Sequence, residues 1–265
     1  APAIRRAAKL FRKQLKSDRL VTATMDRLIP DPHSDGLKSA DVVIEAIFED
    51  LDAKQELFRQ IEPVIRDDTL LCTNTSSIPL QELGECLNRP DRLLGLHFFN
   101  PVDRMQLVEI VHAENTDIEV INQAAAFTVQ IAKLPLKVKS SPGFLVNRVL
   151  MPYLLEAAFM VQEGIDPALI DKASLKFGMP MGPVELADKV GLDICLSVAE
   201  ILSKRLGGKV PDILNDKVSS ANLGVKSGRG FYEYRNGKPV KHKVEETNEQ
   251  MLTIQDRLML RLLNE

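Results

Sequence analysis

The sequence predicts an α/β domain followed by an all-α domain, and three observations support this fold class. Short apolar runs rich in Val, Ile and Leu, bounded by Asp, Pro, Asn and Ser, recur over residues 26–112 and are typical of buried strands. An amphipathic stretch separates two of these runs, which favours a right-handed crossover and a mostly parallel sheet. From Phe144 onward the pattern is helical, and Gly-Pro pairs separate shorter helices.

Length and composition indicate a globular protein of one or two domains. The chain has 265 residues, of which 45% are hydrophobic and 27% charged, and its formal net charge is −3 at pH 7. Such a balance gives no general attraction to nucleic acid or to anionic lipid. Cys72, Cys86 and Cys195 suit neither a disulfide framework nor a zinc site, so we expect a reducing, cytoplasmic location. No apolar run approaches the roughly 18 residues that a membrane span needs.

The chain opens with two expected helices. Apolar residues recur at helical spacing over the first fifteen positions, and a second amphipathic piece continues to about Met25. The first helix carries the most obvious basic run, which is interpreted as a solvated helix face. The recurring apolar residues are Ile4, Ala7, Ala8, Phe11 and Leu15, and the basic ones are Arg5, Arg6, Lys9, Arg12 and Lys13.

The expected strands follow these helices. Residues 50–65 form the amphipathic helix between the second and third strands, and a later helix covers about 118–133. That helix leads into "LPLKVKSSPG", where the strand signals stop. The predicted strands are, in order, "DRLIPDP", "ADVVIEAIF", "DTLLCTNT", "DRLLGLHFF" and "MQLVEIVH".

The helical half begins with "FLVNRVLMPYLLEAAFMVQEG", which is too long and too apolar for a surface helix and is expected to be buried or to face a partner. It ends in a glycine-rich turn, "GVKSGRGFYEY". The expected division is a sheet domain over 1–138, a helical domain over 139–235, and a linker with the start of a further helix over 236–265, in which the polar linker runs from Asn236 to Gln250. Both chain ends are abrupt, which suggests a fragment of a larger protein.

One candidate for chemistry is a histidine and a glutamate on neighbouring predicted strands. Glu109 interrupts the apolar run "LVEIV", and a carboxylate in a core needs a partner because its burial alone is expensive. His97, in the preceding strand, can fill that place. Spacing leaves two interpretations open: a buried structural pair, or a base whose free nitrogen accepts a proton while the carboxylate orients the ring.

Two further stretches carry polar side chains at informative places. "TNTSSIP", residues 73–79, follows a predicted parallel strand, where ligands of open α/β sheets usually lie. A structural alternative is that Ser76 or Ser77 caps the helix after Pro79. Asn147 lies within an apolar helix at the expected domain boundary, where its amide either bonds across helices or faces a cleft.

Taken together, several motifs give a specific resemblance. In this order and at these spacings the chain resembles the 3-hydroxyacyl-CoA dehydrogenases over about residues 1–235, and within them the dehydrogenase segment of bacterial multifunctional fatty-acid oxidation α subunits. The tail "IQDRLMLRLLNE" resembles the start of a second dehydrogenase-like repeat. The motifs are "TNTSSI", "GLHFFNPV" with "LVEIV" after it, "SPGFLVNRVLMPYL", "GMPMGPVELADKVGLD" and "KSGRGFYEY".

The resemblance implies a Rossmann-type NAD-binding domain followed by the family's helical domain, and oxidation of (S)-3-hydroxyacyl-CoA with NAD in fatty-acid β-oxidation. It implies that His97 is the general base and Glu109 its orienting partner, while Ser76 and Asn147 hold the substrate oxygens. It also implies pairing with a second copy or with a second dehydrogenase-like repeat, and a possible thiolase subunit. The positions implied to meet the cofactor are Glu49, Lys54, Ser76, Asn100 and Lys226.

One departure from the family pattern affects the cofactor site. The family begins with a strand, a Gly-x-Gly-x-x-Gly turn that cradles the pyrophosphate, and an acidic residue for the ribose. None of these is present, and "GRGFYE" has the wrong spacing to replace them. The isolated chain is therefore expected to expose a sheet edge, to bind NAD poorly and to be inactive.

Other interpretations are a non-catalytic structural relative of the crystallin type and a dehydrogenase acting on another 3-hydroxy acid. A structural relative is expected to have lost a site residue, yet His97, Glu109, Ser76 and Asn147 all match. For the basic first helix, the resemblance adds contact with the CoA phosphates as an alternative to a solvated face.

Overall fold

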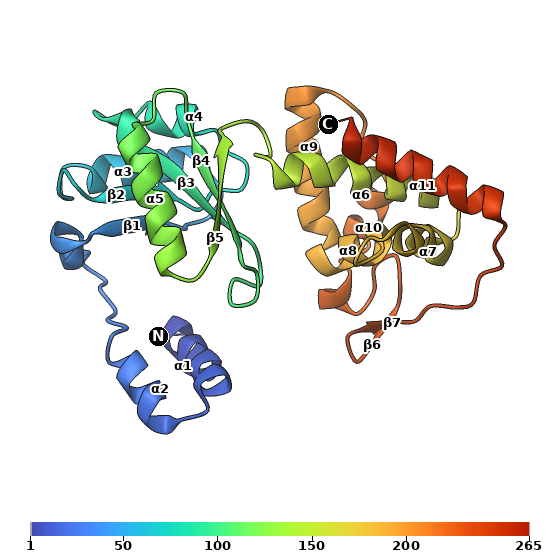
Figure 1. The fold of residues 1–265 in the computed structure, drawn as a ribbon, viewed down its shortest axis with the longest axis horizontal. Helices are drawn as coiled ribbons and strands as arrows, with labels where there is room; N and C mark the ends of the chain where they lie inside the picture. Colours follow the sequence, from blue (N-terminus) through green and yellow to red (C-terminus); the bar gives the residue numbers. More distant parts are fainter. Residues whose placement is uncertain (1, 265) are drawn as a thin grey trace.

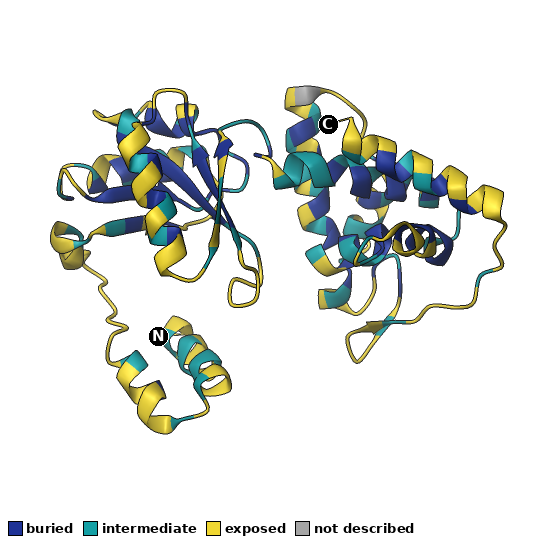
Figure 2. Ribbon diagram, viewed as in Figure 1, coloured by how far each residue is buried: buried dark blue, intermediate teal, exposed yellow. Residues whose placement is uncertain are grey.

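The computed structural model describes residues 2–264, except for the side chain of Leu206. Figure 1 shows a sheet domain beside a helical domain, with the two opening helices standing apart from both. These helices are α1 (Pro2–Leu15) and α2 (Asp18–Met25), as predicted. They pack on each other. No side chain of α1 is buried, and α2 buries Val21 alone among its residues. Figure 2 shows the two helices mainly in the colours of intermediate and exposed residues.

The strand predicted for "DRLIPDP", residues 26–32, is wrong. This segment consists of turns and irregular backbone, and it leads to a short 3-10 helix, η1 (Asp35–Ser39). Two prolines remove the backbone donors that a strand pairs with. Leu28 and Ile29 are 39% and 78% exposed, so the apolar pair that suggested a strand has no core to face.

Five strands form the main sheet in the order β1-β2-β3-β4-β5. All neighbouring strands run parallel except β3 and β4, which are antiparallel. The mostly parallel sheet is thus confirmed, with one reversal between the third and fourth strands. The strands are β1 (Val42–Glu45), β2 (Leu70–Thr73), β3 (Leu93–Phe98), β4 (Leu107–His112) and β5 (Leu134–Lys139).

Helices cover both faces of this sheet because side chains alternate along each strand. On one face, β-strand residues such as Leu71 and Leu93 pack with Phe58 of α3 (Leu51–Ile61) and Leu83 of α4 (Leu80–Gly84). On the other face, residues such as Cys72 pack with α5 (Ile118–Gln130). A 3-10 turn, η2 (Pro90–Arg92), leads into β3.

Capping residues define where several helices begin. Asp50 and Asp117 each accept a hydrogen bond from a backbone amide of the first turn of α3 and α5. In the helical domain, Asp166 caps α7 in the same way, Pro167 occupies its first turn, and Gly178 ends it with a φ of 116°.

The helical domain packs around its long first helix, α6 (Val146–Gln162), which is buried over much of its circumference. Its core also contains residues from each of the other helices, η3 (Val225–Ser227) lies against α8, and a two-stranded hairpin follows. The elements are α7 (Pro167–Phe177), α8 (Pro183–Val190), α9 (Leu192–Leu206), α10 (Asp212–Ser219), η3, β6 (Tyr234–Arg235), β7 (Lys238–Pro239) and α11 (Asn248–Leu263).

The expected final helix is present and belongs to the helical core. It begins at Asn248, within the segment predicted to be linker, because Thr247 and Gln250 form a capping box. Helix α11 packs along α6 and α7, and it buries four apolar side chains that each contribute about 1.5–3 kcal/mol. These are Met251, Ile254, Leu258 and Met259. Arg257 and Arg261 of α11 also bind the buried Glu156 of α6.

Candidate active site

The central feature of the candidate site is the pair formed by His97 and Glu109. The antiparallel register places them directly opposite each other on β3 and β4. The Nδ1 atom of His97 lies 2.7 Å from Oε2 of Glu109, and the two residues are 4% and 0% exposed. A carboxylate only accepts hydrogen bonds, so Nδ1 carries the hydrogen and Nε2 of the neutral ring is left with its lone pair.

The second oxygen of Glu109 joins the sheet to the helical domain. Oε1 accepts hydrogen bonds from the backbone amides of Leu145 and Val146, at 3.0 and 2.8 Å. These amides form the N-terminus of α6, where the helix dipole favours a negative charge. The buried carboxylate is therefore stabilised by three donors from two domains.

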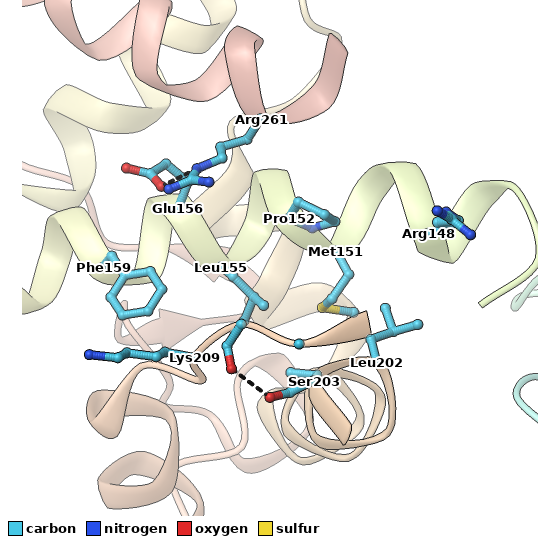
Figure 3. A pocket seen from close by; sticks show the side chains of 13 residues that line it. Arg148, Met151, Pro152, Leu155, Glu156, Phe159, Leu202, Ser203, Lys209 and Arg261 are labelled. Atoms are coloured by element: carbon cyan, nitrogen blue, oxygen red, sulfur yellow. Dashed lines mark hydrogen bonds and ion pairs between the residues drawn. The ribbon is translucent and has the colours of Figure 1, made fainter. Parts of the chain in front are cut away.

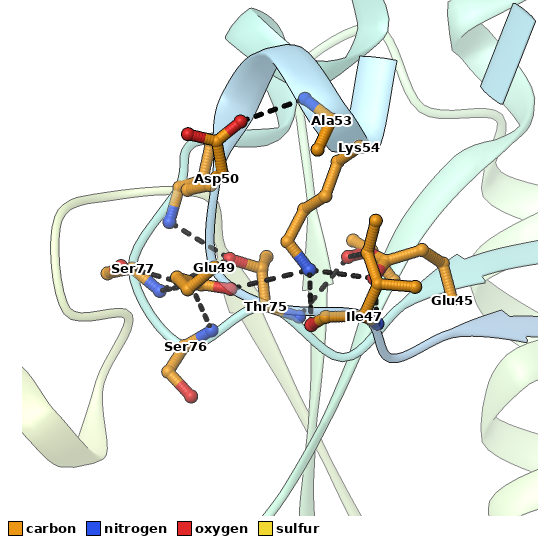
Figure 4. A network of polar contacts seen from close by, with 11 residues as sticks. Glu45, Ile47, Glu49, Asp50, Ala53, Lys54, Thr75, Ser76 and Ser77 are labelled. Carbon is orange, nitrogen blue, oxygen red and sulfur yellow. Dashed lines mark hydrogen bonds and ion pairs between the residues drawn. The ribbon is translucent and has the colours of Figure 1, made fainter. Parts of the chain in front are cut away.

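A second carboxylate, Glu49, organises the turn after β2 (Figure 4). Its Oε1 accepts bonds from the amides of Ser76 and Ser77, at 2.9 and 3.1 Å, and from the hydroxyls of Thr75 and Ser77. Burial raises the pKa of Glu49, but these hydrogen bonds and the charge of Lys54 outweigh burial and lower it. Neither serine caps α4, whose N-cap is Pro79, so the structural alternative for "TNTSSIP" is wrong.

A third carboxylate, Glu45 at the end of β1, was not predicted from the sequence. Its side chain is fully buried and accepts bonds from Lys54 Nζ at 2.7 Å, Thr73 Oγ1 at 2.6 Å and the Ile47 amide at 2.6 Å (Figure 4). Lys54 is 1% exposed, and its ammonium also lies 3.4 Å from Glu49. The signal was available, since Glu45 interrupts an apolar strand just as Glu109 does.

Three of the predicted residues present unengaged polar side chains. Ser76 and Asn147 are partly buried, and Asn100 is exposed in the loop between β3 and β4. Within residues 2–264, their side chains make no hydrogen bond to protein. Asn74 joins the turn that carries Ser76 to the end of β3, because its Oδ1 accepts the amide of Phe98 at 3.0 Å. These groups are available to a bound molecule.

Lys226 is not joined to the other predicted residues by any contact in the described part of the chain. It lies in η3 of the helical domain, and its ammonium forms an ion pair with Asp193 at 2.5 Å. The two side chains are 46% and 38% exposed.

The glycine-rich motifs of the helical domain surround two buried aspartates. Asp171 accepts bonds from the Val184 amide at 2.9 Å and from Tyr232 and Lys241 at 2.8 Å. A Cβ on Gly182 would lie 2.2 Å from Asp171, so only glycine fits there. Asp188 accepts the amides of residues 231 and 232, and a Cβ on Gly230 would lie 2.0 Å from its carboxylate.

Residues 2–264 contain neither a metal-binding cluster nor a membrane-spanning helix. No group of three or more His, Cys, Asp or Glu side chains is arranged to hold a metal ion. No helix in this range is long and apolar enough to cross a membrane.

Comparison with known families decides what kind of protein carries this site. Residues 2–141 match the NAD binding domain of 3-hydroxyacyl-CoA dehydrogenases, and residues 143–234 match their C-terminal domain. The chain belongs to the 3-hydroxyacyl-CoA dehydrogenase family. The first match confirms the predicted Rossmann-like domain and NAD as its cofactor, and the second confirms the predicted helical domain of this family.

Individual members of the 3-hydroxyacyl-CoA dehydrogenase family are similar over most of the chain. The fatty acid oxidation complex subunit alpha of Shewanella baltica is 36% identical over 276 residues, covering 98% of this chain and 39% of its own length. The chain thus spans about two fifths of such relatives. The (S)-3-hydroxybutyryl-CoA dehydrogenase of Ralstonia eutropha is 35% identical, with a TM-score of 0.79, covering 86% of this chain and 83% of that one. The 3-hydroxybutyryl-CoA dehydrogenase of Escherichia coli K12 is 35% identical, with a TM-score of 0.84, covering 94% of this chain and 55% of that one.

Proposed function

We propose that this chain is the dehydrogenase portion of a multifunctional fatty-acid oxidation protein and oxidises (S)-3-hydroxyacyl-CoA to 3-oxoacyl-CoA with NAD. The observation that carries the proposal is the 2.7 Å contact between His97 Nδ1 and Glu109, which leaves Nε2 of a buried histidine without a protein partner in the described chain. Family membership supplies the class of reaction. The geometry supplies a group suited to taking a proton.

In the proposed mechanism, His97 acts as the general base through Nε2. Oxidation of a secondary alcohol removes the hydroxyl proton and a hydride, and the chemistry that NAD would supply here is that of a hydride acceptor. His97 takes the proton and becomes an imidazolium whose Nδ1–H still donates to Glu109. Because Glu109 is held by Leu145 and Val146 as well, it stays in place as the charge on the ring changes.

Ser76 and Asn147 are proposed to hold the oxygens of the hydroxyacyl or ketoacyl group. Their side chains are unengaged, and they come from the turn after β2 and the first turn of α6, on either side of the domain boundary. A hydroxyl and an amide can donate to the developing carbonyl oxygen. Substrate binding would thus draw on both domains.

The residues proposed to meet NAD fit this role to different degrees. Ser76 and Asn100 have unengaged side chains near the carboxyl ends of β2 and β3, where ligands of α/β sheets bind. Glu49 shapes the same turn. Lys54 is 1% exposed and fully engaged, so its support for a cofactor passes through Glu49. Lys226 would reach the cofactor from the helical domain.

The division of the chain and its partners are also proposals. We propose a cofactor domain over 1–138, a helical substrate and pairing domain over 139–235, and a linker with a further helix over 236–265, in a cytoplasmic protein. That further helix, α11, packs on the helical domain. The apolar helix α6 supports pairing with a second copy or a second dehydrogenase-like repeat. Its Leu155 and Phe159 line a cavity of about 420 Å³ between α6 and α9, which none of the predicted site residues lines (Figure 3). A thiolase subunit is a further proposed partner.

The proposal is tested by following NADH oxidation by acetoacetyl-CoA. The assay uses the present chain and a form extended upstream by about 30 residues, which a first strand, turn and helix start require. We expect turnover in the extended form and none in the present chain. Turnover in neither would contradict the proposed function and favour a structural relative or another substrate, and a micromolar Kd for NADH in the present chain would contradict the expected weak cofactor binding.

A further inference from the structure

We propose that Phe144 is a positioning residue, which holds the imidazole of His97 in the orientation that the proposed reaction needs. The inference rests on the proposed function and adds a residue that family membership does not assign. It combines three observations on the segment between β5 and α6: a left-handed backbone, a buried aromatic ring against His97, and backbone amides directed at Glu109.

The chain makes a tight turn over Ser141-Pro142-Gly143-Phe144, and its last two residues have a left-handed backbone. The amide of Phe144 donates to the carbonyl of Ser141 at 2.9 Å, and Gly143 has a φ of 76°. Proline followed by glycine is the usual composition of a type II turn, so this part is explained locally. Phe144 itself has a φ of 53°, which a bulky side chain rarely adopts and which local sequence does not explain.

The side chain of Phe144 explains why glycine does not occupy this left-handed position. Although it lies just before α6, in the segment assigned to the helical domain, it is 2% exposed and belongs to the core of the sheet domain with Val111 and Val138. Its ring meets the His97 ring edge-on, with centroids 5.4 Å apart and an interplanar angle of 66°. The Phe99 ring packs against the same imidazole, with the two ring centroids 4.6 Å apart. The two phenyl rings pack against an imidazole that is 4% exposed, and they restrict its rotation.

The left-handed backbone also serves the other member of the pair. Immediately after Phe144, the amides of Leu145 and Val146 point at Oε1 of Glu109. One turn thus delivers a ring to His97 and two donors to Glu109. Backbone strain of this kind persists only where surrounding structure enforces it, and it is concentrated at functional sites. We infer that Phe144 sets the orientation of the imidazole, and that the contact of Nδ1 with Glu109 depends on this orientation.

The test is ¹⁵N NMR of the imidazole in the full 265-residue chain, with the His97 signals assigned from their loss in His97→Ala. In the wild type we expect one tautomer, protonated at Nδ1, with a slowly exchanging Nδ1–H and cross-relaxation between the His97 and Phe144 rings. Neither observation requires turnover or cofactor. A rapidly exchanging Nδ1–H or a mixture of tautomers in the wild type would overturn the proposal.

Two variants separate the ring from the backbone. Phe144→Leu keeps an apolar side chain at the left-handed position, and Phe144→Gly removes both the ring and the strain. We expect each to lose the single Nδ1–H signal. Phe177→Leu, at an exposed ring of α7, is the control for loss of a ring, and Ala132→Gly, at a φ of 58°, is the control for relief of strain. Both controls should keep the wild-type signal.

The outcomes distinguish this inference from the proposed function. A folded Phe144→Leu protein with an unchanged His97 spectrum would overturn the inference whether or not the enzyme turns over. If the variants do not fold, the wild-type measurements decide. A dehydrogenase assay that fails, beside the expected spectra, would contradict the proposed reaction and leave the role of Phe144 in place.

Discussion

Two buried carboxylates, one in each domain, have similar surroundings and different consequences. Glu109 is 0% exposed and Asp171 is 1% exposed, and each accepts hydrogen bonds from backbone amides and from side chains. The partners of Asp171 all belong to the helical half of the chain. Those of Glu109 come from both halves, namely His97 in the sheet and the N-terminus of α6.

The difference lies in what the partners can do next. Burial and the nearby charge of Asp171 raise the pKa of Tyr232, so its hydroxyl keeps its proton. Burial lowers the pKa of Lys241, but hydrogen bonds to Asp171 and Glu185 raise it above its usual value. His97, by contrast, retains a second nitrogen that is not bonded within residues 2–264. A buried carboxylate therefore marks a reactive site only when its partner keeps a free titratable atom.

The largest expected effect is on turnover, in Glu109→Gln of the extended form. An amide cannot stabilise the imidazolium as a carboxylate does, so kcat should fall about 10²–10⁴-fold, the usual contribution of a general base. The Kd for NADH should stay nearly unchanged. The measurement is NADH oxidation by acetoacetyl-CoA. Full activity in this variant would show that Glu109, like Asp171, has only a structural role.

The counterpart change, Asp171→Ala, should act on stability. It leaves Lys241 and Tyr232 without their buried partner, and breaking such a pair typically costs about 3–5 kcal/mol in unfolding free energy. Lys172→Ala, which removes an exposed ion pair with Glu246, should cost at most about 1 kcal/mol. Urea unfolding measures both. Equal stability of Asp171→Ala and the wild type would show that the hydrogen bonds of Asp171 do not stabilise the helical domain.

A smaller effect is expected from Glu49, whose pKa is lowered in the folded chain. Such a carboxyl stabilises the fold above its ordinary value of 4.5, and the stabilisation is lost as pH falls through the lowered value. Glu49→Gln should therefore lose less Tm than the wild type between about pH 6 and about pH 3. The exposed Glu56→Gln is the control. If the Tm of Glu49→Gln and that of the wild type depend on pH in the same way, Glu49 does not stabilise the turn after β2 through its charge.

The smallest structural effect is expected for Lys226→Met. Its ion pair with Asp193 is exposed, so unfolding free energy should change by less than about 1 kcal/mol. The Kd for NADH in the extended form should rise all the same if Lys226 meets the cofactor from the helical domain. Isothermal titration measures the affinity, and an unchanged Kd would remove Lys226 from the proposed site.

Most of the fold was predictable from the sequence because local apolar patterns encode it. Alternating and continuous apolar runs located β1 to β4, and helical periodicity located the opening pair and α3. The strand predicted for "DRLIPDP" was wrong, because Leu28 and Ile29 form an apolar pair typical of a strand but are exposed to solvent. The start of the final helix was also predicted too late, after Gln250, because Thr247 was not recognised as its N-cap.

The candidate site was predictable only where one motif held both partners. His97 and Glu109 lie twelve positions apart on adjacent strands, so their contact follows from a hairpin-like register. Two features could not be derived in this way: the amides of residues 145 and 146 on Glu109, and the left-handed Phe144 beside His97. These depend on how the start of the helical domain meets the sheet, which no local pattern encodes.

The most direct test of the central claim is turnover in His97→Ala, measured in the upstream-extended form by NADH oxidation with acetoacetyl-CoA. We predict that kcat falls by a factor of about 10²–10⁴ while the Kd for NADH stays close to the wild-type value. Wild-type kcat in a folded His97→Ala protein would contradict the assignment of His97 as the base and leave its pairing with Glu109 a purely structural feature.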